Sequence, residues 1–335
     1  MLTRPGDLPE SAIADALERS WGFRVAALTY QPLGFGSHHW LATGSAGRLL
    51  FATVADLTAK LHTARDTTDA AFVRLAAAFA TAGALRADAG LSFVIAPVPA
   101  AGGHAVARLS DRYCLVVHPY LAGEAAGQDG EFARDQDRRT VLDMLIQIHG
   151  ARVGHPRADD FVVPNLDALQ AMIDEPRAEW GPGPYARAAR SLLDAHARDL
   201  SALAEAYGGL ASRVAARRER MVITHGEPHA SNVMATDDGL VLVDWDTALL
   251  APPERDLWHL ADDDGSVLDT YAAATGAEID EQALTLYRLR WDLAEIAEYL
   301  ALFRSPHADT ADTRESWADL QQYMRPAERW PALTG

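Results

Sequence analysis

The sequence predicts an α+β protein of two lobes, an N-terminal antiparallel sheet plus helix followed by a mainly helical C-terminal lobe. The chain has 335 residues, which is long enough for two separate hydrophobic cores. Its 49% hydrophobic and 23% charged residues are typical of folded globular proteins. Predicted strands dominate before Gly123, and predicted helices dominate after it. We therefore expect lobes at residues 1–120 and 121–335.

The N-terminal lobe opens with a predicted helix. Asp7 is placed to cap it, Pro9 stands in its first turn, and Glu10 can reach back to the cap. The helix is expected to stop near Gly22. The expected strands are 23–31, 38–43, 48–54, 104–109 and 113–120, and an alanine-rich helix is expected at 66–86. Cys114 is the only cysteine and lies in an apolar run, which excludes an internal disulfide and indicates core packing.

A glycine-containing turn separates the first two strands. In Leu33-Gly-Phe-Gly-Ser37, the missing Cβ atoms of Gly34 and Gly36 would let backbone N–H groups approach phosphates. Taken alone, the same pattern is also typical of an ordinary hairpin turn. The turn by itself leaves both readings open.

The C-terminal lobe is predicted from helical spacing of apolar residues. The expected helices are 140–149, 185–207, 210–220, 254–261, 267–274 and 280–303, with a proline- and glycine-rich break at 175–184. His149 is expected to end its helix, and His229 is expected to form hydrogen bonds and not to bind metal. Asp256 is expected to cap a helix or to brace a neighbouring loop.

Two apolar runs in this lobe carry the polar residues that indicate chemistry. Residues 221–224 and 240–243 read as buried strands, separated by a turn signal at Asp237-Asp238-Gly239. Asn232 follows the first strand and Asp244 follows the second. Amide and carboxylate oxygens suit Mg²⁺, which completes its shell with phosphate and water. Glu227 is placed to orient a substrate hydroxyl. The competing interpretation is that these residues only cap strand ends.

The ordered set His225-Gly-Glu227, Asn232 and Val243-Asp-Trp-Asp246 resembles the catalytic and metal-binding loops of the aminoglycoside phosphotransferase family. That family has a protein-kinase-like fold, and the segment 244–257 is most similar to its spectinomycin-type branch. The resemblance extends from about residue 25 to 305. It implies that residues 1–120 bind a nucleotide and that the second lobe supplies the catalytic groups. The resemblance implies that Asn232 and Asp244 bind Mg²⁺ and that Glu227 stands in place of a catalytic Asp. It also implies that Gly34, Gly36 and Ser37 cover the phosphates of the nucleotide. The backbone of Val117 and Pro119 would contact a purine ring.

The chain departs from the family at three positions. Thr53 stands where the family carries a strand lysine, and it can offer a hydrogen bond but no charge. The following helix has no glutamate to pair with such a lysine; Asp66 and Asp69 are its acids near that place. Glu227 replaces Asp and moves the carboxylate by about 1 Å. Lys60, the only lysine, or Arg65 would have to supply the missing charge.

The net charge of −17 disfavours nucleic acid as a partner and favours a cationic or polyhydroxylated small molecule, although acidity equally serves solubility. The expected acceptor contacts are Glu227, Asp246, Glu254, the acids at 262–264, and Trp291. We expect no membrane association, because no apolar stretch approaches spanning length and the start lacks a signal-peptide core. The expected location is the cytoplasm.

The resemblance and the residues together predict a phosphotransferase. It would move the γ-phosphoryl of ATP or GTP, with Mg²⁺, to a hydroxyl of an aminoglycoside- or aminocyclitol-like acceptor, in the setting of antibiotic resistance. The alternative is a pseudokinase-like protein that binds nucleotide or ligand with little or no transfer. Thr53 favours the alternative, whereas the pair Asn232 and Asp244 argues against it.

Overall fold

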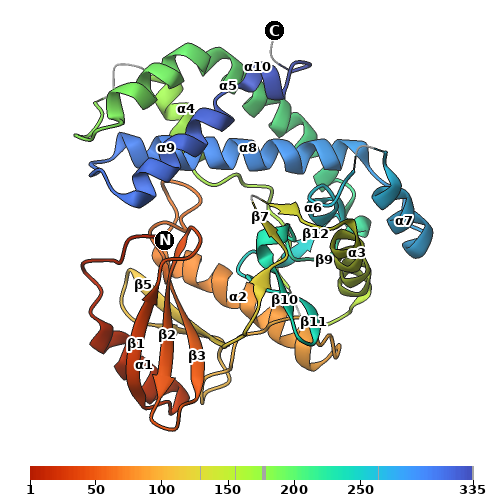
Figure 1. The fold of residues 1–335 in the computed structure, drawn as a ribbon. Helices are drawn as coiled ribbons and strands as arrows, with labels where there is room; N and C mark the ends of the chain where they lie inside the picture. Colours follow the sequence, from red (N-terminus) through yellow and green to blue (C-terminus); the bar gives the residue numbers. More distant parts are fainter. Residues whose placement is uncertain (129, 155, 176–178, 263, 334–335) are drawn as a thin grey trace.

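The computed structural model describes residues 1–128, 130–154, 156–175, 179–262 and 264–333. An N-terminal antiparallel sheet lies beneath a mainly helical C-terminal region (Figure 1), which confirms the predicted α+β class. The sheet has the order β1-β2-β3-β5-β4. Its strands are β1 (Val25–Gln31), β2 (Ser37–Gly44), β3 (Leu49–Asp56), β4 (Val106–Arg108) and β5 (Tyr113–Pro119), each close to its predicted position.

Two helices cover the two faces of this sheet. α1 (Glu10–Trp21) packs Ile13 and Leu17 against Trp40 and Leu115. α2 (Thr68–Ala87) packs Phe79 and its neighbours against the other face, together with the buried Cys114. Side chains alternate along a strand, so odd-numbered residues of β2 and β3 face away from α1. His39 and Thr53 therefore lie on the face opposite α1.

The first helix begins differently from the prediction. Pro9 is its N-cap, and no side chain caps it. Asp7 instead accepts a hydrogen bond from the Tyr113 hydroxyl at 2.8 Å and pairs with Arg112. The helix ends at Gly22, whose φ of 61° is favoured by glycine, as predicted. The capping role predicted for Asp7 is therefore wrong, because its carboxylate binds Tyr113 at the start of β5 and the preceding Arg112.

α2 also corrects an expectation about membranes. Its 20 residues are long and apolar enough to cross a bilayer by length and composition, contrary to the sequence expectation. The helix nevertheless buries Leu75, Phe79 and Leu85 in the core beneath the sheet. A core helix of a folded domain passes the same test, so the feature is weak evidence for a membrane span.

The C-terminal region is built mainly from helices. They are α3 (Asp135–Gly150), α4 (Leu166–Asp174), α5 (Ala186–Ala215), α6 (Glu254–Leu257), α7 (Ser266–Thr275), α8 (Glu281–Arg304), α9 (Ala311–Tyr323) and α10 (Pro326–Arg329), with 3-10 turns η1 (Arg218–Arg220) and η2 (Ala230–Asn232). Its short strands are β6 (Glu124–Ala125), β7 (Gly127–Gln128), β8 (Glu131–Phe132), β9 (Val222–Thr224), β10 (Val233–Thr236), β11 (Gly239–Leu242) and β12 (Leu249–Ala251). Residues 176–178 of the predicted break lie outside the described residues.

α5 is one helix where the sequence predicted two. The pair Gly208-Gly209 was expected to break it, yet the helix continues through both glycines. Leu203, Tyr207 and Leu210 stay on one buried face across the pair and pack against α8 (Figure 1). Burial of that continuous face outweighs the roughly 1 kcal/mol that each glycine costs in a helix.

The strands around the predicted catalytic loops belong to two small sheets. The turn Asp237-Asp238 joins β10 to β11, and β10 also pairs with β6. β9 is not part of this sheet; it pairs with β12. The two apolar runs are thus in separate sheets, and the segment 225–232 connects them. This connection places the Glu227 loop beside the end of β11.

Candidate active site

The loop that follows β9 is held in place by Asp256 of α6. Asp256 is fully buried, and its carboxylate accepts hydrogen bonds from the backbone N–H groups of His225 at 2.9 Å and Gly226 at 2.6 Å. His149, at the end of α3, lies 3.1 Å from the same carboxylate. Asp256 therefore braces the loop, which was one of its two predicted roles, and His149 belongs to the same support.

Gly226 is required by its geometry. Its φ is 105°, a value that side-chain-bearing residues rarely adopt, and a Cβ there would lie 2.4 Å from a guanidinium nitrogen of Arg255. Arg255 is itself buried and donates to Thr224 Oγ1 at 2.8 Å and to the Thr247 carbonyl at 3.0 Å. The backbone at Gly226 therefore packs against the Arg255 guanidinium, and Glu227 follows directly.

Asn232 and Asp244 meet beside Glu227. The side-chain N–H of Asn232 donates to the Glu227 carbonyl at 3.0 Å, so the amide oxygen of Asn232 is directed elsewhere. The backbone N–H of Val243 donates to the Asn232 carbonyl at 3.0 Å, which brings Asp244 next to this residue. Asp244 has a φ of 61°. This strained backbone turns the chain sharply after β11.

The electrostatics of the site show an excess of negative charge. Loss of hydration in the cleft, followed by repulsion from Asp246, raises the pKa of Glu227 to about 7. Loss of hydration and repulsion from Asp246 and Glu227 raise the pKa of Asp244 to about 8. Lys60 lies among these acids, and its ammonium is 2.7 Å from Asp246 Oδ2. One lysine faces three carboxylates, which is a strong reason for a cation to bind here.

The residues fit a divalent cation that is shared with a ligand. Among the described residues, the Asp244 carboxylate accepts no hydrogen bond from protein atoms, and no three acids, histidines or cysteines form a complete metal site. Asn232 and Asp244 would supply two oxygen ligands, and phosphate oxygens and water would supply the rest. Mg²⁺ is usually held in this way in phosphoryl-transfer sites.

A cavity of about 230 Å³ opens beside Glu227. Asp246 and Lys60 line one side, and Trp258 and Trp291 line another. Trp291 donates from Nε1 to the Tyr323 hydroxyl at 2.8 Å, which fixes the indole. Glu227, Asp246 and Trp291 therefore line the same cavity, and their contact with an acceptor stays a prediction. The other charged residues of the lining are of both signs: Arg74, Arg157, Arg255, Arg290, Asp159 and Asp160.

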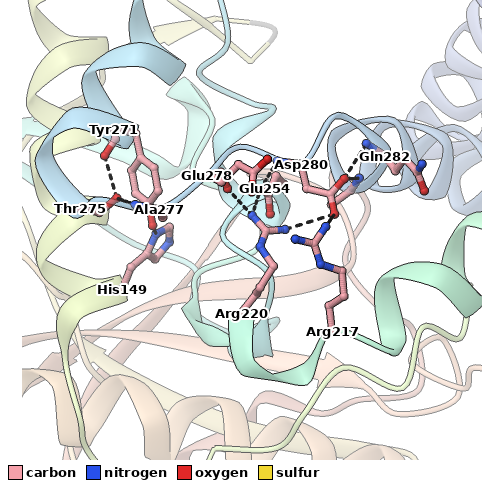
Figure 2. A network of polar contacts seen from close by, with 11 residues as sticks. His149, Arg217, Arg220, Glu254, Tyr271, Thr275, Ala277, Glu278, Asp280 and Gln282 are labelled. Atoms are coloured by element: carbon pink, nitrogen blue, oxygen red, sulfur yellow. Dashed lines mark hydrogen bonds and ion pairs between the residues drawn. The ribbon is translucent and has the colours of Figure 1, made fainter.

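Glu254 does not join this cavity. It is fully buried, accepts hydrogen bonds from Arg220 at 2.5 Å and from the Asp280 backbone at 2.8 Å, and so belongs to a network that ties η1 to the start of α8 (Figure 2). These contacts contradict the predicted substrate contact of Glu254. Glu254 is instead paired with Arg220, because a carboxylate that is buried without a partner loses the free energy of its hydration.

The acids at 262–264 also have another role. Asp262 accepts hydrogen bonds from the hydroxyl of Ser266 and the backbone of Val267, and Asp264 accepts one from the backbone of Ser266. Both therefore cap the first turn of α7. Asp263 lies outside the described residues. The prediction that this acidic run faces the acceptor gains no support from the two described members.

The predicted nucleotide contacts lie along the sheet. Gly34 and Gly36 have φ values of 59° and 78°, so the turn does use the glycine conformations. Thr53 Oγ1 is 3.1 Å from His39 Nδ1 and is already engaged. The Val117 carbonyl accepts from the Val98 N–H at 2.7 Å, and Pro119 has no N–H to donate. The Val117 carbonyl is thus already engaged once, and both contacts stay predictions.

Sequence reasoning missed two acids of α8. Burial, then repulsion from neighbours that include Glu298 and Glu227, raises the pKa of Glu295 to about 7. Burial also raises the pKa of Glu298, and Lys60 acts in the opposite direction. Glu295 therefore lies within electrostatic range of Glu227, and Glu298 lies within electrostatic range of Lys60. Their spacing of three residues on a helix could have indicated a shared face.

The comparisons with known proteins agree with this geometry. A model described as "Phosphotransferase enzyme family" matches residues 40–299. Protein StrN of Streptomyces griseus is 33% identical over 251 residues, which is 72% of this chain and 74% of that protein. The spectinomycin phosphotransferase APH(9)-Ia, in complex with ADP and spectinomycin, superposes with a TM-score of 0.69 at 15% identity, covering 95% of this chain and 97% of its own. The amicoumacin kinase hAmiN, in complex with AMP-PNP, Ca²⁺ and Ami, gives a TM-score of 0.60 at 13% identity, covering 96% and 94%.

Proposed function

Because this chain belongs to the phosphotransferase enzyme family, we propose that it transfers the γ-phosphoryl group of ATP or GTP to a hydroxyl of an aminoglycoside- or aminocyclitol-like acceptor. The observation that carries the proposal is the convergence of Glu227, Asn232 and Asp244 beside an open cavity. The sheet of residues 1–120 binds the nucleotide, and residues 121–335 supply the catalytic groups and the acceptor site. Asn232 and Asp244 would hold Mg²⁺, and the bound ion would neutralise phosphate charge.

Glu227 acts on the acceptor. The acceptor oxygen forms a bond to the γ-phosphorus while the bond from phosphorus to the bridging oxygen breaks, and a nucleoside diphosphate leaves. The hydroxyl proton passes to the Glu227 carboxylate. A pKa of about 7 suits a group that must accept a proton near neutral pH and release it afterwards. The hydrogen bond from Asn232 to the Glu227 carbonyl keeps this base beside the metal ligands.

A cationic acceptor is supported by Glu227, for which the described residues provide no lysine or arginine ion pair, and by further acids near it. Glu227 and Asp246 line the cavity, and Glu295 and Glu298 of α8 lie within electrostatic range of Glu227 and Lys60 respectively. The net charge of −17 adds a long-range attraction for cations. The complex of APH(9)-Ia with spectinomycin fits the same class of acceptor. A reaction that consumes ATP or GTP also fits a location in the cytoplasm, and the likeness to a spectinomycin phosphotransferase supports a role in antibiotic resistance.

The experiment that tests the proposal is product detection with a panel of acceptors. Aminoglycosides, aminocyclitols, neutral sugars and nucleosides are each incubated with enzyme, Mg²⁺ and ATP or GTP, and phosphorylated products are identified by mass spectrometry. We expect product with a cationic acceptor, and an apparent KM that rises with added salt, because a Debye length of about 8 Å at physiological ionic strength screens exposed charges. Product only with neutral acceptors would contradict the acceptor class.

The alternative function, a pseudokinase-like binding protein, is favoured by one observation. Thr53 carries no charge, and its hydroxyl is engaged by His39. The same panel separates the two functions: nucleotide binding without product from any acceptor would support the binding protein.

A matched pair of variants on α8 tests the acceptor site. Glu298→Gln should raise the KM for a cationic acceptor, whereas Glu281→Gln, at the far end of the helix, should leave that KM unchanged.

A further inference from the structure

The sheet carries no cation where the resemblance places a lysine. Thr53 occupies that position on β3, and its hydroxyl contacts His39. Burial lowers the pKa of His39 to about 3 and that of His118, on the adjacent strand β5, to about 4. Both imidazoles are therefore neutral at physiological pH. Thr53, His39 and His118 would therefore offer a polyphosphate on this face hydrogen-bonding groups but no positive charge.

Lys60 brings a charge to the same cleft from another direction. It follows β3 by only a few residues, and its ammonium reaches Asp246 at 2.7 Å. It also lies directly under the glycine turn, since a Cβ built on Gly36 would be 3.6 Å from Lys60 Nζ. The ammonium is thus between the turn proposed to cover the phosphates and the acids proposed to hold the metal.

The backbone of Lys60 is fixed by α2. Arg74 of α2 donates to the Lys60 carbonyl at 2.8 Å, and Asp66 holds the same guanidinium in an ion pair. The Lys60 N–H donates to the carbonyl of the fully buried Leu57. The helix therefore positions the lysine through its main chain and needs no glutamate for the purpose. This arrangement explains why the missing glutamate and the missing strand lysine occur together.

Three other cations of the cavity are already committed. Arg255 donates to Thr224 and Thr247, and Arg290 donates to the Val162 carbonyl and faces Asp159 at 3.7 Å. Arg74 is held by Asp66 and Lys60. Lys60 is different because its partner, Asp246, is a half-buried acid of the catalytic cleft. A flexible four-carbon stem also lets an ammonium change partners within a site.

We propose that Lys60 replaces the strand lysine as the group that binds the nucleotide's phosphates and neutralises charge during transfer. The inference rests on the proposed function. Without nucleotide, Asp246 holds the ammonium in place. With nucleotide bound, Lys60 donates to phosphate oxygens under the Gly36 turn, and the Asp246 carboxylate is released toward the acceptor. The single lysine of the chain thereby becomes a catalytic residue that comes from a turn after β3.

The test compares Lys60→Met with a variant that moves the charge back, Thr53→Lys/Lys60→Met. Nucleotide affinity is measured by calorimetry, and product formation is measured with an acceptor that the wild type uses. Lys60→Met should lower kcat/KM about a hundredfold, the effect expected for removal of one preorganised donor, and should weaken nucleotide binding. Restoring a lysine on the strand should recover at least part of both. The matched control is Arg24→Met, which removes an exposed cation elsewhere in the N-terminal lobe and should change neither.

If the ion pair between Lys60 and Asp246 only stabilised the fold, the same variants would give a different result. In that case Lys60→Met would lower the melting temperature, Asp246→Asn would restore it in the double variant, and nucleotide affinity would hardly change. Equal affinity and turnover in wild type and Lys60→Met, or no recovery with lysine at position 53, would overturn the inference. If the wild type itself bound no nucleotide, the proposed function would fail first, so the two failures are distinguishable.

Discussion

The ammonium of Lys60 lies 2.7 Å from Oδ2 of Asp246, although 186 residues separate the two along the chain. This contact joins the loop after β3 to the segment after β11, and so connects the sheet to the catalytic loops. Gly36 lies beside the same ammonium. Three segments of the chain, which contain Gly36, Lys60 and Asp246, therefore meet at the Lys60 ammonium.

Glu227→Gln tests the proposed base. The substitution keeps size and hydrogen bonding but removes the ability to accept a proton, so kcat should fall by roughly 10² to 10⁴. Nucleotide affinity, measured separately by calorimetry, should hardly change. Glu227→Asp restores the residue of the related family with a shorter side chain, and it should be slower in a loop shaped for glutamate. Identical trace rates in all three proteins would remove Glu227 from the mechanism.

Gly226→Ala tests the backbone of the catalytic loop. The new methyl group would need a φ of 105° and would meet the buried Arg255 guanidinium. Gly239→Ala is the matched control, because it has a φ of 114° and open space around the Cβ position. Backbone strain alone costs about 1–3 kcal/mol. We expect Gly226→Ala to lose more unfolding free energy than Gly239→Ala in denaturant titrations, and to lose activity as well. Equal losses would show that the approach of Arg255 does not matter.

Asp256→Ala tests the brace of the loop. The carboxylate accepts two buried N–H groups, from His225 and Gly226, and an unsatisfied buried donor costs about 1–3 kcal/mol. We expect a loss of about 3 kcal/mol in unfolding free energy and a kcat that falls more than nucleotide affinity, because Glu227 is displaced. Asp238→Ala, in the exposed hairpin turn, serves as control and should change neither quantity. If Asp256→Ala kept the wild-type free energy of unfolding, other groups would have to hold the loop that contains His225 and Gly226.

Much of the fold was predictable, since the strands of the sheet and the helices α2, α3 and α8 follow local apolar spacing. The pairing of β9 with β12 and the continuity of α5 were not, because they depend on tertiary contacts such as those of Tyr207 with α8. Glu227, Asn232 and Asp244 were found from their order in the sequence. Burial of Glu254 by Arg220 and the reach of Lys60 to Asp246 depend on long-range packing, which no local pattern encodes.

His118→Phe tests the burial of a neutral imidazole under the sheet. Its folded-state pKa of about 4 lies below the usual unfolded value of about 6.5. Below pH 6.5 the unfolded chain therefore takes up a proton that the folded chain does not, and stability falls as pH falls toward 4. At pH 5 this effect is about 2 kcal/mol. Phenylalanine retains ring packing against Phe79 without the titration. The stability difference between variant and wild type should shift in favour of the variant by that amount between pH 7.5 and pH 5; a constant difference would contradict it.

The most direct test of the central claim is nucleotide-induced thermal stabilisation with and without Mg²⁺, in wild type and in Asp244→Ala. At about a hundred times its Kd, ATP or GTP should stabilise the wild type by roughly 2.7 kcal/mol. The stabilisation should require Mg²⁺ and should disappear in Asp244→Ala, because Asn232 alone cannot hold the metal. Absence of stabilisation by any nucleotide at millimolar concentration, or full stabilisation of Asp244→Ala, would contradict the assignment of this site to metal-dependent phosphoryl transfer.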